Sequence, residues 1–294
     1  MNSGGRSVKK RQRRLGLYLA LPLAAGLLFC YILPLLLAFW KSLFRGMGHK
    51  FIGFKNYEEL LSNNTFRLAV TNTALFWVVG ITLNLLLGLM LALLCSRLCG
   101  RWLQALTFLP AMIPAACAVA MARLLLDDTS FPLSFARLLG NRMENWANSA
   151  ASFWVLIVLF LWKSGGYTVI LLTAALFSVP PEVLEAAMID GAGPLCTLLR
   201  IKLPLIRGSV GLSALIALVN SFKIFREAFL IGGTHPHDAL YSIQHFLQNN
   251  FSNLNYARLA AASILIVLLV AAASGLGAAL LSRPRRRGAA YENR

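Results

Sequence analysis

Residues 149–177 read SAASFWVLIVLFLWKSGGYTVILLTAALF, and the only charged side chain among these 29 residues is Lys163. This stretch exceeds the roughly 20 apolar residues that an α-helix needs to cross the hydrocarbon core of a bilayer. No water reaches the peptide groups there, so a single crossing segment must satisfy its own backbone as a helix. We therefore predict a membrane-spanning helix at this position.

Five further segments meet the same requirement, which makes six expected spans. They are Leu15–Trp40, Leu68–Leu94, Trp102–Leu126, Gly208–Ile231 and Leu259–Ser282. The chain of 294 residues is 58% apolar and 13% charged, with a mean hydropathy of +0.67, which is typical of a membrane protein. The expected fold class is therefore all-α, a polytopic membrane protein with six transmembrane helices.

Basic residues are unevenly distributed among the connecting segments. Segments 1–14, 96–102, 178–207 and 283–294 hold 16 Lys and Arg residues in 63 positions, whereas 41–67, 127–150 and 232–257 hold 7 in 77. Because basic segments resist translocation, we expect the first set, and with it both termini, to be cytoplasmic. The expected organisation is a basic cytoplasmic tail over 1–14, a transmembrane domain over 15–282 and a second basic cytoplasmic tail over 283–294.

Several functional classes lack the residues that they need. The net charge of +17 does not indicate nucleic acid, because the basic residues lie between apolar blocks and not on one face. The chain has neither a G-x-x-x-x-G-K-[ST] phosphate loop nor a common hydrolase motif, so we expect no catalysis by it. The five cysteines show no zinc spacing, and His235 and His237 are better interpreted as solvated loop residues than as metal ligands.

The segment between the fourth and fifth spans is the most informative. Residues 180–193 read PPEVLEAAMIDGAG, and the chain continues to Ile201-Lys202-Leu203-Pro204. Pro181 suits the first turn of a helix and Gly191 suits the turn that ends one, which predicts two short helices around a glycine. Apolar residues recur along this loop and form a stripe that requires a partner surface: Leu184, Met188, Leu195, Leu198 and Leu199.

This loop, residues 180–204, resembles the E-A-A loop of the membrane subunits of binding-protein-dependent ABC importers. The matching residues are Glu185, Ala186, Ala187, Asp190, Gly191, Ala192, Ile201, Leu203 and Pro204. The likeness extends along the chain in the pattern of the sugar-uptake branch, with runs at 51–57, 72–73, 88–89, 108–110 and 232–233. Such a spaced run before the penultimate span is far more specific than an isolated Glu-Ala-Ala.

The resemblance implies a permease subunit of an ATP-driven importer for a sugar or related polar solute, in a bacterial-type inner membrane. Besides the bilayer, it implies two ATP-binding subunits that use the ATP and Mg, an external solute-binding protein, and a second permease, expected to be a different chain although a second copy is an alternative. The chain itself is expected to bind no cofactor. Loop 180–204 would dock its first helix on an ATP-binding subunit, with Glu185 as an ion-pair partner, Ala186 and Ala187 allowing close approach, and Asp190 bracing the turn.

Polar residues inside the expected spans suggest where a solute passes, since such residues are costly in lipid. Lys163 has no acid near it along its own helix, and Gly165-Gly166 is expected to loosen that helix against a cavity; snorkelling or an interhelical ion pair is the alternative. Lys223 and Glu227, four residues apart, favour a pair on one helix face. Aromatic rings stack on sugars, and amides and hydroxyls bind sugar hydroxyls, which gives these candidate path residues: Trp154, Trp162, Lys163, Asn220, Ser221 and Phe222.

Two other functional classes share this hydropathy pattern. A secondary transporter or channel would explain the intramembrane charges, but it would not need the coupling loop, and the internal repeats common in such transporters are not evident. A membrane-bound enzyme or scaffold would need a catalytic set that the sequence lacks. Loop 180–204 therefore favours the importer subunit.

Overall fold

The computed structural model describes residues 21–45, 50–98, 101–126 and 146–282. The two basic tails, residues 15–20 of the first expected span and loop residues 127–145 lie outside the described part. Five described helices are long and apolar enough to cross a bilayer: Leu21–Ser42, Asn64–Ser96, Ala151–Phe177, Pro194–Gly232 and Tyr256–Gly275. A sixth span exists only as a bent pair of helices, Trp102–Met112 and Ala115–Leu126. The all-helical, multi-spanning fold class is confirmed, whereas the orientation of the termini stays a prediction.

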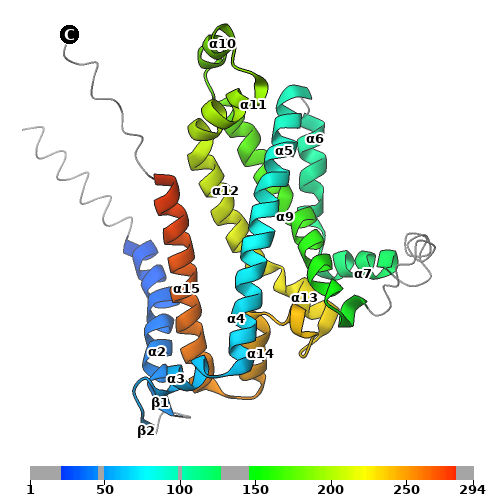
Figure 1. Ribbon diagram of the computed structural model, residues 1–294. Coiled ribbons are helices and arrows are strands. Elements are labelled where there is room, and N and C mark those ends of the chain that lie inside the picture. The colour runs from blue at the N-terminus through cyan, green and yellow to red at the C-terminus, as the bar shows by residue number, and fades with distance from the viewer. Residues whose placement is uncertain (1–20, 46–49, 99–100, 127–145, 283–294) are drawn as a thin grey trace, which may run out of the picture. The chain divides into compact units, whose positions relative to one another are not determined.

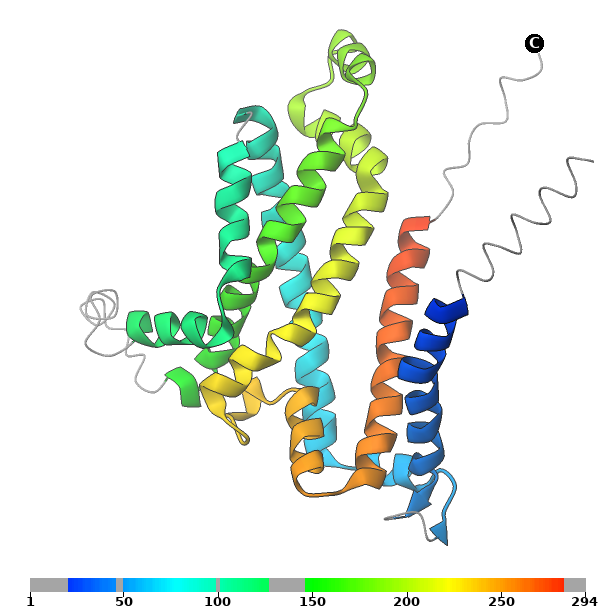
Figure 2. The same ribbon diagram turned by 180° about the vertical axis from the view of Figure 1, so that it is seen from behind.

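The chain forms two compact units, and the first comprises residues 1–63 and 250–269. Its elements are η1 (Leu28–Ile32), α2 (Leu33–Ser42), β1 (Phe44–Arg45), β2 (Lys50–Phe51), α3 (Lys55–Leu61) and the first half of α15 (Tyr256–Ser282). That half of α15 lies beside α2 in both views (Figures 1 and 2). None of the apolar window of Leu21–Ser42 is buried within the described residues, which suits a helix surrounded by lipid or by another membrane chain.

Polar contacts close the turn after α2. The hydroxyls of Ser42 and Tyr57 lie 2.6 Å apart, and the amide nitrogen of Asn56 donates to the carbonyls of Ser42 and Phe44 at 2.7 and 2.9 Å. β1 and β2 pair antiparallel in the same turn. Asn56 and Tyr57 belong to the run at 51–57 noted in the sequence, and here they satisfy backbone and hydroxyl groups that would otherwise lack partners.

The second unit, residues 64–249 with 270–294, is a helical bundle built around α9. Its elements are α4 (Asn64–Phe76), η2 (Trp77–Ile81), α5 (Thr82–Leu98), α6 (Arg101–Phe108), η3 (Leu109–Met112), α7 (Ala115–Leu126), η4 (Trp146–Asn148), α9 (Ala151–Phe177), α10 (Pro181–Ile189), α11 (Pro194–Cys196), η5 (Thr197–Lys202), α12 (Leu203–Lys223), α13 (Phe225–Gly232), η6 (Asp238–Leu240) and most of α14 (Ile243–Ser252). α9 packs against α5, α6 and α12. Half of its apolar window is buried, more than in any of the other four continuous spans.

Close packing around α9 depends on a glycine. A Cβ added at Gly166 would lie 2.5 Å from the carbonyl oxygen of Thr107, so α6 can approach only because no side chain intervenes. Two residues further along α9, Thr168 Oγ1 donates to Asn84 Oδ1 of α5 at 2.5 Å. The expectation that Gly165-Gly166 loosens the helix is wrong, since α9 is continuous from Ala151 to Phe177 and Gly166 serves helix contact.

The third expected span breaks at Ile113. Pro114 disfavours helical backbone at the preceding residue, and Ile113 is extended, with φ −73° and ψ 128°. α7 consequently leaves at 98° to the preceding helix, and Figure 1 shows it running across the direction of α6. The expectation of one straight helix over Trp102–Leu126 is therefore wrong. Arg123 fixes α7, because its guanidinium donates to the carbonyls of Leu230 and Ile231, at 2.9 and 3.3 Å, at the end of α13.

Two prolines inside long helices follow π turns. Pro34 comes just after η1 and Pro204 just after η5. In a regular α-helix a proline ring clashes with the carbonyl four residues earlier, and a wider turn relieves this clash. The helix that begins at Pro194 therefore continues without a stop into the fifth span.

Candidate functional site

A cavity of about 390 Å³, here called the central cavity, opens where α9 meets the break between η3 and α7 and the junction between α12 and α13. Ile113, at the first break, and Ile224, between α12 and α13, both line it. Irregular backbone at membrane depth is tolerated where it lines a water-containing cavity. The polar side chains of the wall are Lys163, Ser164, Tyr167, Asn220, Lys223, Arg226 and Glu227.

An ion pair joins α9 to α13 inside the central cavity. Lys163 Nζ lies 2.5 Å from Glu227 Oε1, and the two side chains are only 17% and 3% exposed. The expected pair between Lys223 and Glu227 is wrong, because the helix breaks at Ile224 and Glu227 turns toward α9. The interhelical alternative for Lys163 is the one that the structure shows. A second contact between the same walls joins Asn220 Nδ2 to Ser164 Oγ at 3.4 Å.

The other path candidates lie elsewhere. Trp154 and Trp162 sit two turns apart on a more exposed side of α9, and neither is among the described residues that line the central cavity. Ser221 and Phe222 line a separate, smaller cavity of about 30 Å³. Ser221 Oγ donates to the carbonyl of Leu218 at 2.6 Å, and the Phe222 ring meets Trp77 edge-on. Of the six candidates, the structure brings together Lys163 and Asn220.

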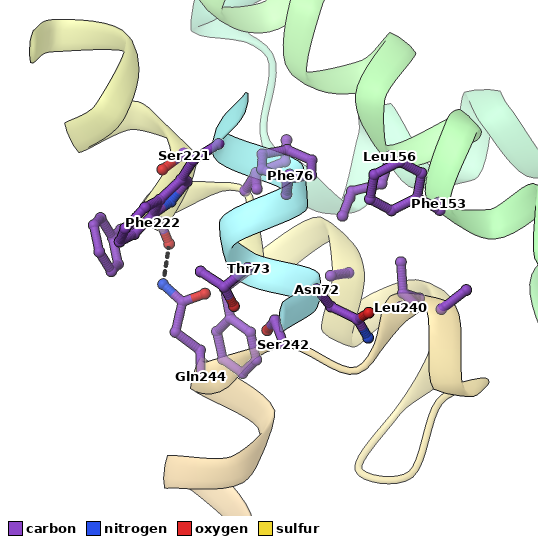
Figure 3. Close-up of a pocket in the computed structure, with 15 residues that line it drawn as sticks. Asn72, Thr73, Phe76, Phe153, Leu156, Ser221, Phe222, Leu240, Ser242 and Gln244 are labelled. Atoms are coloured by element: carbon purple, nitrogen blue, oxygen red, sulfur yellow. Dashed lines mark hydrogen bonds between the residues drawn. The ribbon is translucent and has the colours of Figure 1, made fainter. Parts of the chain in front are cut away.

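The smaller cavity shows how the break between α12 and α13 is stabilised. The carbonyl of Phe222, in the last turn of α12, accepts a hydrogen bond from Gln244 Nε2 at 3.0 Å, drawn as the dashed line in Figure 3. Carbonyls in the last turn of a helix lack intrahelical partners, so a side chain from α14 can satisfy this one. Sequence reasoning missed Gln244, since nothing local connects it to a residue 22 positions earlier.

Asn72 and Thr73, one of the runs noted in the sequence, hold the loop before α14 against α4. Asn72 Nδ2 donates to the carbonyls of Asp238 and Tyr241 at 2.5 and 2.9 Å, and Thr73 Oγ1 accepts from the backbone nitrogen of Ile243 at 3.0 Å. Both residues are labelled in Figure 3. The run therefore supports the connection between α13 and α15.

His245 is the most strongly perturbed titratable group of this connection. Its side chain is fully buried, in contact with the rings of Phe225, Phe229 and Tyr241. Nδ1 accepts a hydrogen bond from the backbone nitrogen of Ser242 at 3.2 Å. Removal from water lowers the pKa of His245 to about 4, so the ring is neutral at ordinary pH.

Loop 180–204 has the expected form of two helices around a glycine. α10 ends at Ile189, and Gly191 adopts φ +74°, a left-handed conformation that glycine reaches at little cost. The turn is closed by backbone hydrogen bonds from Gly191 to Met188 at 3.1 Å and from Ala192 to Ala187 at 2.9 Å. The expectation that Asp190 braces this turn is wrong, because its exposed carboxylate makes no hydrogen bond within the described residues.

The apolar side chains of this loop do not all face the same way. Leu184 and Leu198 turn inward and line a cavity beneath the loop. Met188 borders the same cavity but keeps 64% of its surface exposed, Ile189 is 87% exposed, and Leu195 and Leu199 are exposed as well. Of the motif residues, Glu185, Ala186, Asp190, Gly191 and Pro204 are exposed, Ala192, Ile201 and Leu203 are partly buried, and Ala187 is buried.

A broken span beside a polar cavity is typical of membrane transport proteins. The fold and the site together therefore define a subunit of a membrane transport system. Residues 84–286 match the family described as binding-protein-dependent transport system inner membrane component, and the chain belongs to this family. It is thus a multi-pass permease subunit of a binding-protein-dependent importer, and its family is one of transport permeases, not of enzymes.

Several characterised proteins are similar over most of their length. The trehalose/maltose transport system permease protein MalF of Thermococcus litoralis is 29% identical over 90% of this chain and 92% of its own. The sn-glycerol-3-phosphate transport system permease protein UgpA of Yersinia pseudotuberculosis is 28% identical over 86% of this chain and 89% of its own. A chain of a bacterial ABC transporter involved in the import of the acidic polysaccharide alginate has the same fold, with a TM-score of 0.77 at 22% identity over 96% of this chain and all of that chain.

Proposed function

We propose that this chain carries a sugar or related polar solute across the inner membrane of a bacterial-type cell, driven by ATP that separate subunits hydrolyse with Mg. The observation that carries this proposal is the exposed apolar end of α10, where Met188 and Ile189 are 64% and 87% exposed beside the left-handed turn at Gly191. A soluble loop gains nothing from two such side chains in water, whereas a docking helix buries them against a partner. Family membership supports a coupling role for this loop.

In the proposed contact, apolar burial supplies most of the free energy. Burying apolar surface contributes about 25 cal/mol per Å², whereas an exposed ion pair contributes about 0 to 1 kcal/mol. Glu185 and the free carboxylate of Asp190 then set the orientation through cations on the ATP-binding subunit. The small side chain of Ala186 adds little bulk to the outward face of α10, so the partner can approach closely.

The remaining partners of the proposed complex are a second permease, two ATP-binding subunits and an external solute-binding protein. A solved structure with the same fold contains a bacterial alginate ABC transporter with its oligosaccharide-bound periplasmic protein. Relatives named for trehalose/maltose, glycerol 3-phosphate and osmoprotective compounds favour a polar, hydroxyl-bearing solute here. They include charged and uncharged solutes, so they leave the charge of the solute open.

Docking through α10 can be tested by replacing Ile189 with Asp. This position contributes little to the fold because the side chain is 87% exposed, so the chain should insert normally. In cells that express the whole transporter, Ile189→Asp should reduce co-purification of the ATP-binding subunit and ATP-driven uptake together, whereas Ile189→Leu should preserve both. Normal co-purification and uptake by Ile189→Asp would refute the docking role.

A further inference from the structure

The charged groups of the central cavity do not balance. Three cations line it, Lys163, Lys223 and Arg226, against the single carboxylate of Glu227. Lys163 is compensated, since its ammonium lies 2.5 Å from that carboxylate. Lys223 and Arg226 make no ion pair within the described residues and are more exposed than the pair. The wall therefore carries two uncompensated positive charges beside a helix break.

The uncharged polar groups of the wall can also donate. Asn220 offers an amide NH₂, and Tyr167 and Ser164 offer hydroxyls. The carboxylate of Glu227, the only one among the described lining residues, contacts Lys163 through Oε1. Such a wall suits a ligand group that only accepts hydrogen bonds and carries negative charge. A guanidinium matches the two oxygens of a carboxylate or phosphate, and an ammonium beside it adds a second donor.

The position of Lys223 and Arg226 along the chain also favours an anionic ligand. Both unpaired cations flank Ile224, the residue between α12 and α13, and the break before α7 also lines the cavity, through Ile113 and Pro114. Uncompensated charge within an apolar span is costly, so it indicates a water-filled or ligand-filled space. About 390 Å³ is large enough for a ligand group of several heavy atoms.

We propose that the central cavity binds an anionic group of the transported solute, a carboxylate or a phosphate ester, through Arg226 and Lys223. This inference rests on the proposed function and narrows its substrate class to acidic solutes. The Lys163–Glu227 pair is neutral in this arrangement and positions α13, which carries Arg226, against α9. The same phosphate chemistry is present in lipid headgroups, so a test must separate a soluble anion from a lipid.

The test uses the assembled transporter in nanodiscs of zwitterionic lipid, and it measures thermal stabilisation by added ligand at constant ionic strength. Glucuronate and glycerol 3-phosphate should stabilise the complex, whereas their neutral counterparts glucose and glycerol should not. In Lys223→Gln/Arg226→Gln the apparent affinity for the anions should fall about tenfold or more. Arg67→Gln, the same change at an exposed cation of α4 outside the cavity, should retain it.

Three results would overturn the proposal. The anions fail to stabilise the unmodified complex, the double variant binds them as well as Arg67→Gln does, or the effect appears only when anionic lipid is supplied in place of soluble anion. Binding-protein-stimulated ATP hydrolysis is measured on the same preparation. If it persists while the anions have no effect, the importer function stands and only the anionic substrate class fails; if it is absent from the unmodified complex, the proposed function fails.

Discussion

Loop 180–204 and the central cavity differ in how the chain builds them. The loop presents its partner-facing groups from one continuous run, and its shape depends on local backbone at Gly191. The central cavity takes its polar groups from two separate segments, 163–167 and 220–227, and its principal contact joins Lys163 and Glu227, which are 64 residues apart. Outward groups of the loop are exposed, whereas the ion pair in the cavity is almost completely buried.

Because of this difference, substitutions in the loop should affect coupling to ATP, whereas substitutions in the cavity should affect stability. A change in the loop should leave the bundle intact and remove the link to ATP, because few bundle contacts depend on its outward face. A change in the cavity should act first on the free energy of folding, because a buried charge is costly without its partner. Substitutions in the two regions should therefore fail in different ways.

The largest expected effect is at Gly191. Its φ of +74° is strained for any other residue by about 1–2 kcal/mol, and a β-branched side chain is especially unfavourable there. We expect Gly191→Val to abolish ATP-driven uptake while the spans still insert. The control is Gly193→Val, since Gly193 has an extended backbone and open space around an added Cβ. Uptake should be measured in proteoliposomes, and equal uptake by the two variants would remove the functional role of this turn.

The second prediction concerns the ion pair of the cavity. Removing one partner of a buried pair costs about 3–5 kcal/mol, whereas replacing both with apolar groups is often close to neutral. Lys163→Met should therefore reduce assembly, and Lys163→Met/Glu227→Met should restore most of it. A thermal-stability double-mutant cycle in nanodiscs measures the coupling. If Lys163→Met assembles fully and loses only uptake, the pair is not structural and Lys163 acts on the solute.

The third prediction tests whether close packing between α6 and α9 fixes these two helices beside the central cavity. Gly166→Ala places a methyl group 2.5 Å from the carbonyl of Thr107, which should destabilise the chain by about 1–3 kcal/mol. Gly165→Ala meets no atom within 4 Å and should be neutral or slightly stabilising. Thermal unfolding of the two purified variants gives the comparison. Equal stability would show that α6 and α9 separate easily at this point.

The same contrast explains how far the sequence predicted the structure. Apolar runs located the second, fourth and fifth spans within several residues at most ends, because length and hydropathy are local properties. The turn at Gly191 was predictable for the same reason, since proline and glycine mark helix ends within one segment. The motif matched the family because all its members lie in a single loop.

Features that depend on contacts between separate segments of the chain could not be predicted. Gly166 is read correctly only when α6 is seen against α9, because a glycine suits either a loosened helix or a close contact. Glu227 was assigned to Lys223 by spacing along one helix, a rule that fails once the helix breaks at Ile224. The break at Ile113 did have a local signal, Pro114, but the continuous apolar run outweighed it.

The smallest expected effect is at His245, a residue whose neighbours also come from separate segments. Because burial lowers its folded-state pKa to about 4, below its ordinary value of 6.5, the folded state binds this proton less readily than the unfolded state. The contribution of the neutral His245 ring to the free energy of unfolding is therefore complete above about pH 6.5, and it is lost progressively as pH falls toward 4. Between pH 7 and 5.5 the loss should be about 1 kcal/mol, seen as weaker amide-exchange protection in α14. His245→Gln should remove most of this pH dependence, whereas His235→Gln, at an exposed position of the same connection between α13 and α15, should preserve it. An unchanged pH profile in His245→Gln would mean that another group, and not the ring enclosed by Phe225, Phe229 and Tyr241, controls the acid sensitivity of this region.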